Sequence, residues 1–419
     1  MMSKPENAGP MEKGLRLLPG SIEDLDYSAL DWNLLREDLS LPCAVLYQEK
    51  LEHNLEWMQR FAAQYGVKLA PHGKTTMAPK LFAMQLQAGA WGITLATAQQ
   101  TDAAYRHGVR RVLMANQLVG QQNMEIISAL LRDPGFEYYC LVDSADQVEL
   151  LGSFYASRGQ RLQVLVELGV EGGRTGVRND EQLREVLAAL ARWSGTLALC
   201  GVEIYEGVLD DEERIRGLLH RATELTRTLA AEKKFARDPI LLSGSGSAWY
   251  DVVAEAFAGA ALGKAVEIVL RPGCYLTHDA GMYREAQAKI LKRCPIAARM
   301  QWALLPALQV WAYVQSIPEP EKAIVGLGKR DASFDSGLPI PALHFRPGST
   351  APATVPPRWA VTRMMDQHAF LRIEPGDDLQ VGDMIAFDIS HPCLTFDKWR
   401  VMPVIDSRYR VVDVIRTFF

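Results

Sequence analysis

The sequence lacks the features of membrane proteins and of disulfide-stabilised secreted domains. It has no run of about 18 apolar residues, so no transmembrane helix is expected. The segment through about Gly20 is polar and has no apolar core, so it is not expected to be a secretory signal. None of the six cysteines forms a Cys-x-x-Cys pair, which favours reduced thiols over a disulfide framework. We therefore expect a cytoplasmic protein.

An excess of positive charge is also missing. The formal net charge is -5 and the isoelectric point is about 6.0. No basic patch interleaved with aromatic residues occurs, so neither a nucleic acid nor a membrane is expected as a partner. Hydrophobic residues make up 48% of the 419 residues and charged residues 23%, which predicts a sizeable core. The length suits one large domain and one smaller domain.

Between about residues 40 and 285 the chain alternates between apolar, β-rich runs and amphipathic stretches. Strands are expected at Val67–Ala70, Gly92–Ala96, Val112–Ala115, Tyr138–Val142, Leu162–Leu168, Leu197–Ile204, Pro239–Leu242 and Glu267–Leu270. Helices are expected at segments that include Ala78–Ala88, Ala98–His107, Asp180–Trp193 and Asp211–Lys233. Eight strands, each followed by a helix or crossover, predict an α/β fold of the (β/α)8, TIM-barrel type. A doubly wound open sheet is the alternative.

From residue 286 to 419 helical periodicity is weak and turns rich in Pro, Gly and Asp separate strand-like runs. Strands are expected at Gln301–Val314, Lys322–Val325, Ala369–Ile373, Met384–Asp388 and Arg408–Thr417. This pattern predicts a smaller C-terminal β domain, which residues 1–39 are expected to join. The Pro-rich stretch Pro339–Pro357 is interpreted as a long surface loop within it.

The active site of a (β/α)8 barrel lies in the loops that follow its strands. Five of these loops combine glycine with Lys, Arg, Ser or Tyr. They are Pro71–Met77, Glu171–Gly176, Tyr205–Gly207, Ser243–Ser247 and Arg271–Tyr275. This clustering indicates a binding site at that end of the predicted barrel.

Two of the loops point to a phosphorylated aldehyde cofactor. The glycines of Ser243–Ser247 would let backbone amides approach a phosphate and its serines would add donors, although an ordinary flexible turn has the same composition. Lys74 lies in a short loop at the end of an apolar strand. An amine in a shielded site forms a Schiff base, whereas most lysines simply lie on the surface. Pyridoxal 5'-phosphate needs both a phosphate grip and such a lysine.

Several segments occur in the order found in a known family. Leu41–Tyr47, Asn54, Pro71–Thr75, Thr97, Gly172–Gly176, Tyr205–Gly207 and His391–Trp399 resemble the D-serine dehydratase and D-threonine aldolase branch of the alanine-racemase-like, fold type III pyridoxal-phosphate enzymes. The resemblance extends over about residues 40–419 and is nearest to an amino acid deaminase-like subgroup. Pro-His-x-Lys-Thr and His-Pro-Cys-x-Thr-Phe-Asp-Lys-Trp are its most specific segments.

The resemblance implies roles for the loop residues. Lys74 would hold the cofactor as a Schiff base and act as a catalytic base. The phosphate would be held by Ser243, Gly244, Ser245, Gly246 and Ser247. Arg174 would lie near the phenolic oxygen of the cofactor or the substrate carboxylate, unless it is a solvated arginine at a helix start.

Three more residues are expected near the cofactor ring. Tyr205 and Tyr275 would flank it, although either could be an aromatic residue of the barrel packing. Arg271 is placed like the residue that faces the pyridine nitrogen in racemases, where a cation disfavours protonation of that nitrogen.

His391 and Cys393 form the predicted metal site. If they lie on a strand, both side chains point to one face. Imidazole and thiolate are good zinc ligands, but two ligands alone are a weak motif. In the dehydratase branch this His-x-Cys pair binds zinc, whereas aldolase relatives tend to carry Asp in place of the cysteine, which suits a harder ion.

The resemblance therefore implies a metal-assisted dehydratase of a D-3-hydroxy amino acid such as D-serine, which releases a 2-oxo acid and ammonia. Gly73 and the Thr76-Met77 pair depart from the pattern common in eukaryotic D-serine dehydratases, so the substrate could differ. A D-threonine-type aldolase, an amino acid racemase and a non-catalytic cofactor-binding protein are the alternatives. His72 is interpreted as a loop-ordering residue, His368 as either structural or close to the site, and relatives imply a homodimer.

Overall fold

The structure is a computed structural model that describes residues 12–15, 31–263 and 265–419. It divides into two compact units. The described residues of the barrel unit fall within Glu56–Gly273 and Ala286–Ala303, and those of the β unit are 12–15, 31–55, Cys274–Glu285 and Leu304–Phe419. This division differs from the boundaries expected near residues 40 and 285, because two segments of the predicted barrel, 40–55 and 274–285, group with the β unit. Most of the predicted N-terminal segment 1–39 lies outside the described residues.

The barrel unit is built on eight parallel strands in the order β2-β9-β8-β7-β6-β5-β4-β3. The strands are β2 (Lys68–Leu69), β3 (Ile93–Leu95), β4 (Arg111–Gln117), β5 (Glu137–Val142), β6 (Leu162–Leu168), β7 (Leu197–Ile204), β8 (Ile240–Gly244) and β9 (Val266–Leu270). Two backbone hydrogen bonds close the ring between its first and last members: Trp91 N donates to Leu69 O (2.6 Å) and Thr94 N donates to Pro71 O (2.9 Å). The predicted barrel is confirmed, and the open sheet is excluded.

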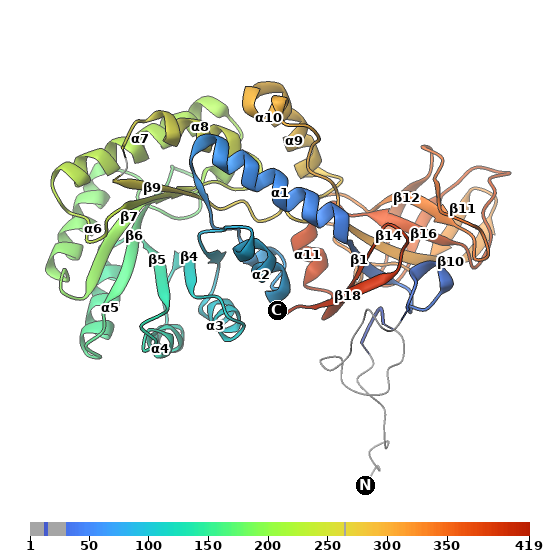
Figure 1. Ribbon diagram of the computed structural model, residues 1–419, viewed down its shortest axis with the longest axis horizontal. Coiled ribbons are helices and arrows are strands. Elements are labelled where there is room, and N and C mark those ends of the chain that lie inside the picture. The colour runs from blue at the N-terminus through green and yellow to red at the C-terminus, as the bar shows by residue number, and fades with distance from the viewer. Residues whose placement is uncertain (1–11, 16–30, 264) are drawn as a thin grey trace, which may run out of the picture. The chain divides into compact units, whose positions relative to one another are not determined.

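A helix follows each barrel strand along the chain, and Figure 1 shows α3 to α8 on the outer side of the strands. The helices are α1 (Gln48–Tyr65), α2 (Pro79–Gln87), α3 (Ala98–Arg106), α4 (Gln121–Leu130), α5 (Ala145–Ala156), α6 (Asp180–Arg192), α7 (Glu212–Ala231), α8 (Tyr250–Gly259), α9 (Met282–Arg293) and α10 (Pro295–Arg299). Thr97, Ser144, Asn179 and Asp211 cap α3, α5, α6 and α7 by accepting a backbone N–H. These caps satisfy donors that a helix start leaves unpaired.

Side chains fill the barrel interior. Inward-facing residues from the strands and the segments that flank them form one buried cluster: Ala70, Trp91, Leu113, Ala115, Tyr139, Leu141, Leu165, Ala198, Cys200, Leu241 and Val269. Every residue of β7 is buried. Burial on both faces explains why most residues in the strands of this sheet are apolar. The barrel is thus a packed core whose loops are left to carry chemistry.

The β unit contains a ten-stranded sheet with β1 (Cys43–Tyr47) inside it. The other strands are β10 (Leu308–Glu319), β11 (Lys322–Val325), β12 (Ile340–Phe345), β13 (Ala353–Thr354), β14 (Ala360–Met364), β15 (Ala369–Arg372), β16 (Met384–Asp388), β17 (Val401–Ile405) and β18 (Val411–Arg416). The main path runs β13-β12-β16-β10-β1-β17-β18, and β11, β15 and β14 extend from β10. β1 is antiparallel to β10 and parallel to β17. The 3-10 turn η3 (Leu34–Arg36) and helix α11 (Pro392–Phe396) complete the unit.

Two expectations for this unit are wrong. The stretch 339–357 is not a plain surface loop, because it contains β12 and β13, and β12 pairs with both β13 and β16. A register shift between Pro341 and Leu343 accommodates the proline in the ladder. The segment that carries His391 and Cys393 is not a strand: His391 precedes α11, and Pro392 occupies its first turn, where proline is favoured.

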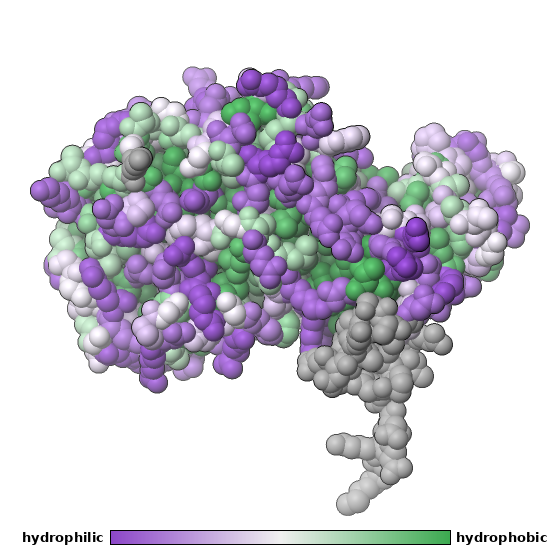
Figure 2. Space-filling model, in the orientation of Figure 1, coloured by the Kyte–Doolittle hydropathy of each residue, from purple (hydrophilic) through white to green (hydrophobic). Residues whose placement is uncertain are grey.

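The described surface is mixed in polarity. Figure 2 shows hydrophilic residues over most of the face in view, with smaller hydrophobic patches among them. Within residues 12–15, 31–263 and 265–419, no helix has both the length and the apolar composition needed to cross a bilayer.

Candidate active site

Lys74 lies in a short 3-10 turn, η4 (Gly73–Thr75), directly after β2 and the His72–Thr94 bridge that joins the strands on either side of the closure. Its side chain is exposed. Tight packing fixes the turn, because a Cβ on Gly73 would lie 2.8 Å from both Ile93 Cγ2 and Phe82 Cε1. The structure therefore places Lys74 after the first barrel strand, as the sequence predicts.

The loops after β8 and β9 meet the lysine turn. Gly273 approaches it so closely that a Cβ there would lie 2.6 Å from Thr75 Oγ1 and 2.9 Å from His72 O. The backbone N–H of Gly273 also donates to Ser247 Oγ (3.1 Å). Three loops singled out from the sequence are thus in direct contact at one end of the barrel.

Arg174 and Tyr205 are brought together by the loops after β6 and β7. The Arg174 guanidinium carbon lies 4.8 Å from the centroid of the Tyr205 ring, a cation–π contact. Arg174 is exposed and Tyr205 is half-buried. The contact leaves the arginine charge open to an anionic ligand while the ring limits its direction.

The pKa of His72 shows that this end of the barrel has a positive electrostatic potential. The residue is partly exposed, but its Nδ1 is buried and has no hydrogen-bond partner among the described residues. Desolvation lowers the pKa of His72 well below 6.5, and the charges of Lys74, Arg271 and Arg174 lower it further. The imidazole is therefore neutral at pH 7. These cations suit a phosphate or a carboxylate.

In the predicted phosphate loop, Ser243–Ser247, hydrogen-bond donors of Ser243, Ser245 and Gly246 already bond to other groups of the protein. The Ser243 hydroxyl donates to Val269 O (3.0 Å) and the Ser245 hydroxyl donates to Gly246 O (2.7 Å). The Glu206 carboxylate accepts the backbone N–H groups of Ser245 (3.1 Å) and Gly246 (2.6 Å). Ser245 has a φ of +84°, a strained value for a residue with a side chain. Glu206 therefore holds the bend of the loop.

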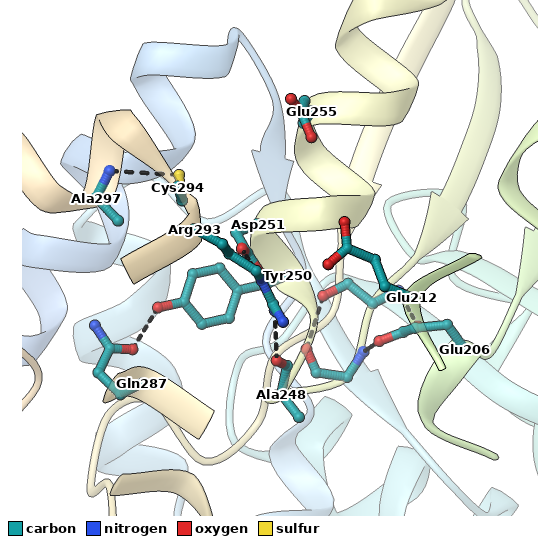
Figure 3. Close-up of polar contacts among 12 residues, drawn as sticks. Glu206, Glu212, Ala248, Tyr250, Asp251, Glu255, Gln287, Arg293, Cys294 and Ala297 are labelled. Atoms are coloured by element: carbon teal, nitrogen blue, oxygen red, sulfur yellow. Dashed lines mark hydrogen bonds and ion pairs between the residues drawn. The ribbon is translucent and has the colours of Figure 1, made fainter. Parts of the chain in front are cut away.

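The rest of this loop leads into the N-terminus of α8. Figure 3 shows Glu206 pointing toward the loop and Arg293 reaching Ala248 and Asp251 at the start of the helix. Arg293 Nε and Nη2 each lie 2.7 Å from an oxygen of Asp251, and Nη2 donates to Ala248 O (3.3 Å). These contacts fix the end of the loop at the start of α8, and a helix N-terminus is a place where anions can bind.

Arg271 is held in place by the buried carboxylate of Glu203. Its guanidinium forms an ion pair with Glu203, and both side chains are at most 3% exposed. Arg271 Nε also donates to Ser243 Oγ (3.1 Å) and Nη2 donates to Ile204 O (3.0 Å). Burial raises the pKa of Glu203, and the charge of Arg271, its ion-pair partner, opposes that rise. These contacts fix the guanidinium in one orientation.

The predicted metal pair lies in the β unit with a carboxylate beside it. His391 Nδ1 is 2.7 Å from Asp335 Oδ2. The hydrogen bond between His391 and Cys393 is the main cause that raises the pKa of His391, to about 9, while desolvation lowers it and Asp335 again raises it. A metal would therefore displace a proton. Across the described ranges, no three His, Cys, Asp or Glu side chains converge as a ready metal-binding group.

Tyr275 and His368 lie in the β unit. Tyr275 is 1% exposed and follows the end of the barrel unit by two residues. His368 is exposed at the turn between β14 and β15, where its carbonyl accepts from Met365 N (2.8 Å). A role for either residue in catalysis stays a prediction.

Three residues of these sites had no role in the interpretation of the sequence: Glu203, Glu206 and Asp335. Glu206 stands between two residues of a quoted motif. Their partners are distant along the chain, so only the fold reveals them. An acidic residue within a strand that is otherwise fully apolar, as Glu203 is in β7, is the one signal that the sequence offers.

The comparisons with known proteins agree with this architecture. The family model "Alanine racemase, N-terminal domain" matches residues 47–276, more than half of the chain, and "Putative serine dehydratase domain" matches residues 307–405. A D-threonine aldolase from Arthrobacter sp is 27% identical over 85% of this chain and 86% of its own length. D-threo-3-hydroxyaspartate dehydratase from Delftia sp. (strain HT23) is 29% identical over 44% of this chain and 48% of its own length.

A solved structure supports the fold over nearly the whole chain. The D-threonine aldolase from Filomicrobium marinum superposes with a TM-score of 0.76 at 23% identity and covers 93% of this chain and 97% of its own. The resemblance noted from the sequence motifs is confirmed. The chain belongs to the alanine-racemase-like, fold type III family of pyridoxal-phosphate enzymes, in the branch that carries a serine dehydratase domain after the barrel.

Proposed function

We propose that the protein is a pyridoxal-phosphate-dependent, metal-assisted lyase that dehydrates a D-3-hydroxy amino acid such as D-serine to a 2-oxo acid and ammonia. The curated relatives that support this are a D-threonine aldolase and a D-threo-3-hydroxyaspartate dehydratase. Both of them act on a D-amino acid with a hydroxyl group on Cβ, so the shared substrate class is the firmest part of the proposal.

The barrel unit would hold the cofactor. Lys74 would carry it, the helix start of α8 would bind its phosphate, and Arg271 would face its ring. Arg174 and Tyr205 would contact the cofactor or the substrate carboxylate. The residues fit such a group, because cations surround His72 and the glycines let three loops meet without side chains between them. Pyridoxal phosphate, when bound, withdraws electrons from the Cα of an amino acid. Lys74 Nζ would take the Cα proton.

The observation that carries dehydration is the Asp335–His391 hydrogen bond of 2.7 Å beside Cys393. A carboxylate on one ring nitrogen fixes the orientation of the ring, so that a metal can bind the other nitrogen in place of the hydrogen bond to Cys393. Imidazole and thiolate together favour zinc over harder ions. A divalent metal, when bound, supplies Lewis acidity that makes a hydroxyl a better leaving group.

Aldol cleavage is the second candidate, because the D-threonine aldolase is similar over 85% of this chain. An aldolase breaks the Cα–Cβ bond, so its products are glycine and an aldehyde. The two reactions need the same substrate class and the same lysine. Cys393 favours dehydration, because a thiolate selects a softer ion than the carboxylate expected in aldolases.

Product analysis tests the proposal. The purified protein, supplied with pyridoxal phosphate and zinc, is assayed with D-serine, D-threonine and D-threo-3-hydroxyaspartate for 2-oxo acid, ammonia, glycine and aldehyde. We expect 2-oxo acid and ammonia in equal amounts. Lys74→Ala should abolish both the cofactor absorbance and the activity, whereas Lys80→Ala, a matched exposed lysine on α2, should change neither.

Each part of the proposal can fail separately. Aldehyde and glycine would move the assignment to the aldolase. Full dehydratase activity in Cys393→Ala would show that the proposed reaction does not depend on a metal at this site. A protein that does not bind pyridoxal phosphate would overturn it altogether.

A further inference from the structure

We infer that Cys274 is a third protein ligand of the metal ion, with His391 and Cys393, so that two thiolates bind one ion. This inference rests on the metal part of the proposed function and deepens it. Cys274 comes from the segment after β9, and the other two residues come from the start of α11, so the site would join two parts of the β unit that are far apart in sequence.

The distance between the sulfur atoms supports the inference. Cys274 Sγ lies 3.7 Å from Cys393 Sγ. Zinc holds thiolates at about 2.3 Å in a tetrahedron, which places two sulfurs about 3.8 Å apart. The two sulfurs therefore already have the spacing that one zinc ion requires.

The third donor adjoins this pair. His391 hydrogen-bonds to Cys393, and its Nδ1 is occupied by Asp335. The contacts thus run as a chain from Cys274 through Cys393 to His391. The described residues hold no group of three donors that already converge, so the ion would have to draw the Cys274 and His391 ends together. Rotation of the cysteine side chains toward the His391 ring, which Asp335 holds, would supply such a movement.

The backbone around the donors is tied in place. Ala280 N donates to Ile389 O (3.0 Å), and Gly281 packs so closely that a Cβ would lie 3.1 Å from Ser390 Cβ. These contacts hold the segment of Cys274 against the segment that leads into His391. Cys274 itself is only 3% exposed, so its thiol is shielded from bulk water, as suits a metal ligand.

The buried carboxylate of Asp279 has one oxygen without a hydrogen-bond partner among the described residues. Asp279 is 1% exposed, its Oδ1 accepts N–H groups from Gly281 (2.9 Å) and Tyr283 (3.0 Å), and its Oδ2 has no hydrogen-bond partner among the described residues. It also interacts electrostatically with His391. An unpaired buried carboxylate oxygen is costly unless a cation lies nearby. A metal ion held by the two cysteines and His391 would supply that cation.

Counting the sulfur ligands of the bound metal tests the inference without a variant. The reduced full-length protein is loaded with zinc and examined by X-ray absorption at the zinc edge. We expect two sulfur neighbours at about 2.3 Å. A single sulfur neighbour would overturn the role of Cys274 and leave the proposed function standing. Failure to bind zinc at all would overturn both.

A cobalt titration with variants gives an independent count. The near-ultraviolet charge-transfer absorbance of the cobalt form should fall to roughly half in Cys274→Ser, and zinc affinity in a competition titration should fall at least about tenfold. Cys294→Ser is the matched control: that cysteine is also buried but lies in the barrel unit, where serine can replace it as the cap of α10. Equal absorbance and affinity in Cys274→Ser and Cys294→Ser would reject the third ligand.

Discussion

Replacing Gly273 by alanine should disturb the lysine turn without touching any functional side chain. A Cβ at this position would lie 2.6 Å from Thr75 Oγ1, 2.9 Å from His72 Cβ and 2.9 Å from His72 O. One of these atoms is a backbone carbonyl oxygen, so rotation of a side chain cannot relieve the clash. Over-packing of this kind costs about 1–3 kcal/mol. In a domain of this size each kcal/mol lowers the melting temperature by roughly 2–4 °C.

Gly195→Ala is the matched control, because a Cβ there meets nothing within 4 Å. Melting temperatures and urea titrations of the full-length variants give the stability change, and a spectroscopic titration gives the affinity for pyridoxal phosphate. We expect Gly273→Ala to be less stable and to bind the cofactor more weakly, while Gly195→Ala matches the unsubstituted protein. If the two variants agree within about 0.5 kcal/mol and bind the cofactor equally, the close approach of the two loops is refuted.

Three further substitutions test the electrostatics of the two units. Burial lowers the pKa of His72 well below 6.5 in the native state. At a pH below about 6.5 the unfolded chain therefore takes up a proton that the native protein excludes. The free energy of unfolding should decrease by up to about 1.4 kcal/mol for each pH unit below that value. His72→Gln should lose that part of the slope in urea titrations across this range, and an unchanged slope would contradict the assignment. Glu203→Leu should cost about 3–5 kcal/mol because it leaves Arg271 buried and unpaired, and adding Arg271→Met should restore most of it; no recovery in the double variant would argue against a pairing cost. Asp335→Ala should weaken zinc binding about 10- to 100-fold, because Asp335 orients His391, with Asp335→Asn, which keeps an acceptor oxygen, affected less; equal affinities in a competition titration would count against that role.

The sequence predicts the barrel well because its strands are buried on both faces. Leu162–Leu168 and Leu197–Ile204 are mostly apolar runs, and the observed strands β6 and β7 have the same bounds. Because each strand is followed directly by its loop, the positions of Lys74, Arg174 and Tyr205 after the strands also follow from local sequence.

The β unit is predicted less well because its structure depends on distant pairing. β1 was not expected as a strand of this unit, since its partners β10 and β17 lie far along the chain. The prolines of the stretch 339–357 concealed β12, because proline within a run normally argues against a paired strand. Pro392 likewise converts the metal-pair segment to a helix start, so the expected strand geometry does not apply.

Contacts between functional residues that are distant along the chain also could not be predicted from the sequence. Glu203 lies in β7 and Glu206 follows it, but their partners Ser245 and Gly246 follow β8, and Arg271 follows β9. Only the parallel order of β7, β8 and β9 brings these groups together. A single sequence shows which residues end each strand but not which of them make contact.

The place of β1 inside the ten-stranded sheet has a consequence for biosynthesis. Leu46 pairs with Leu308 on one side and with Val404 on the other. At about 5–20 residues per second, the ribosome needs roughly 15–70 seconds to reach those partners after it has made β1. During that time a fully apolar strand, Cys43–Tyr47, has both edges unpaired. The barrel unit can complete its own strand pairing within this interval, so the nascent chain passes through a stage in which this strand is the segment most open to chaperones or to aggregation.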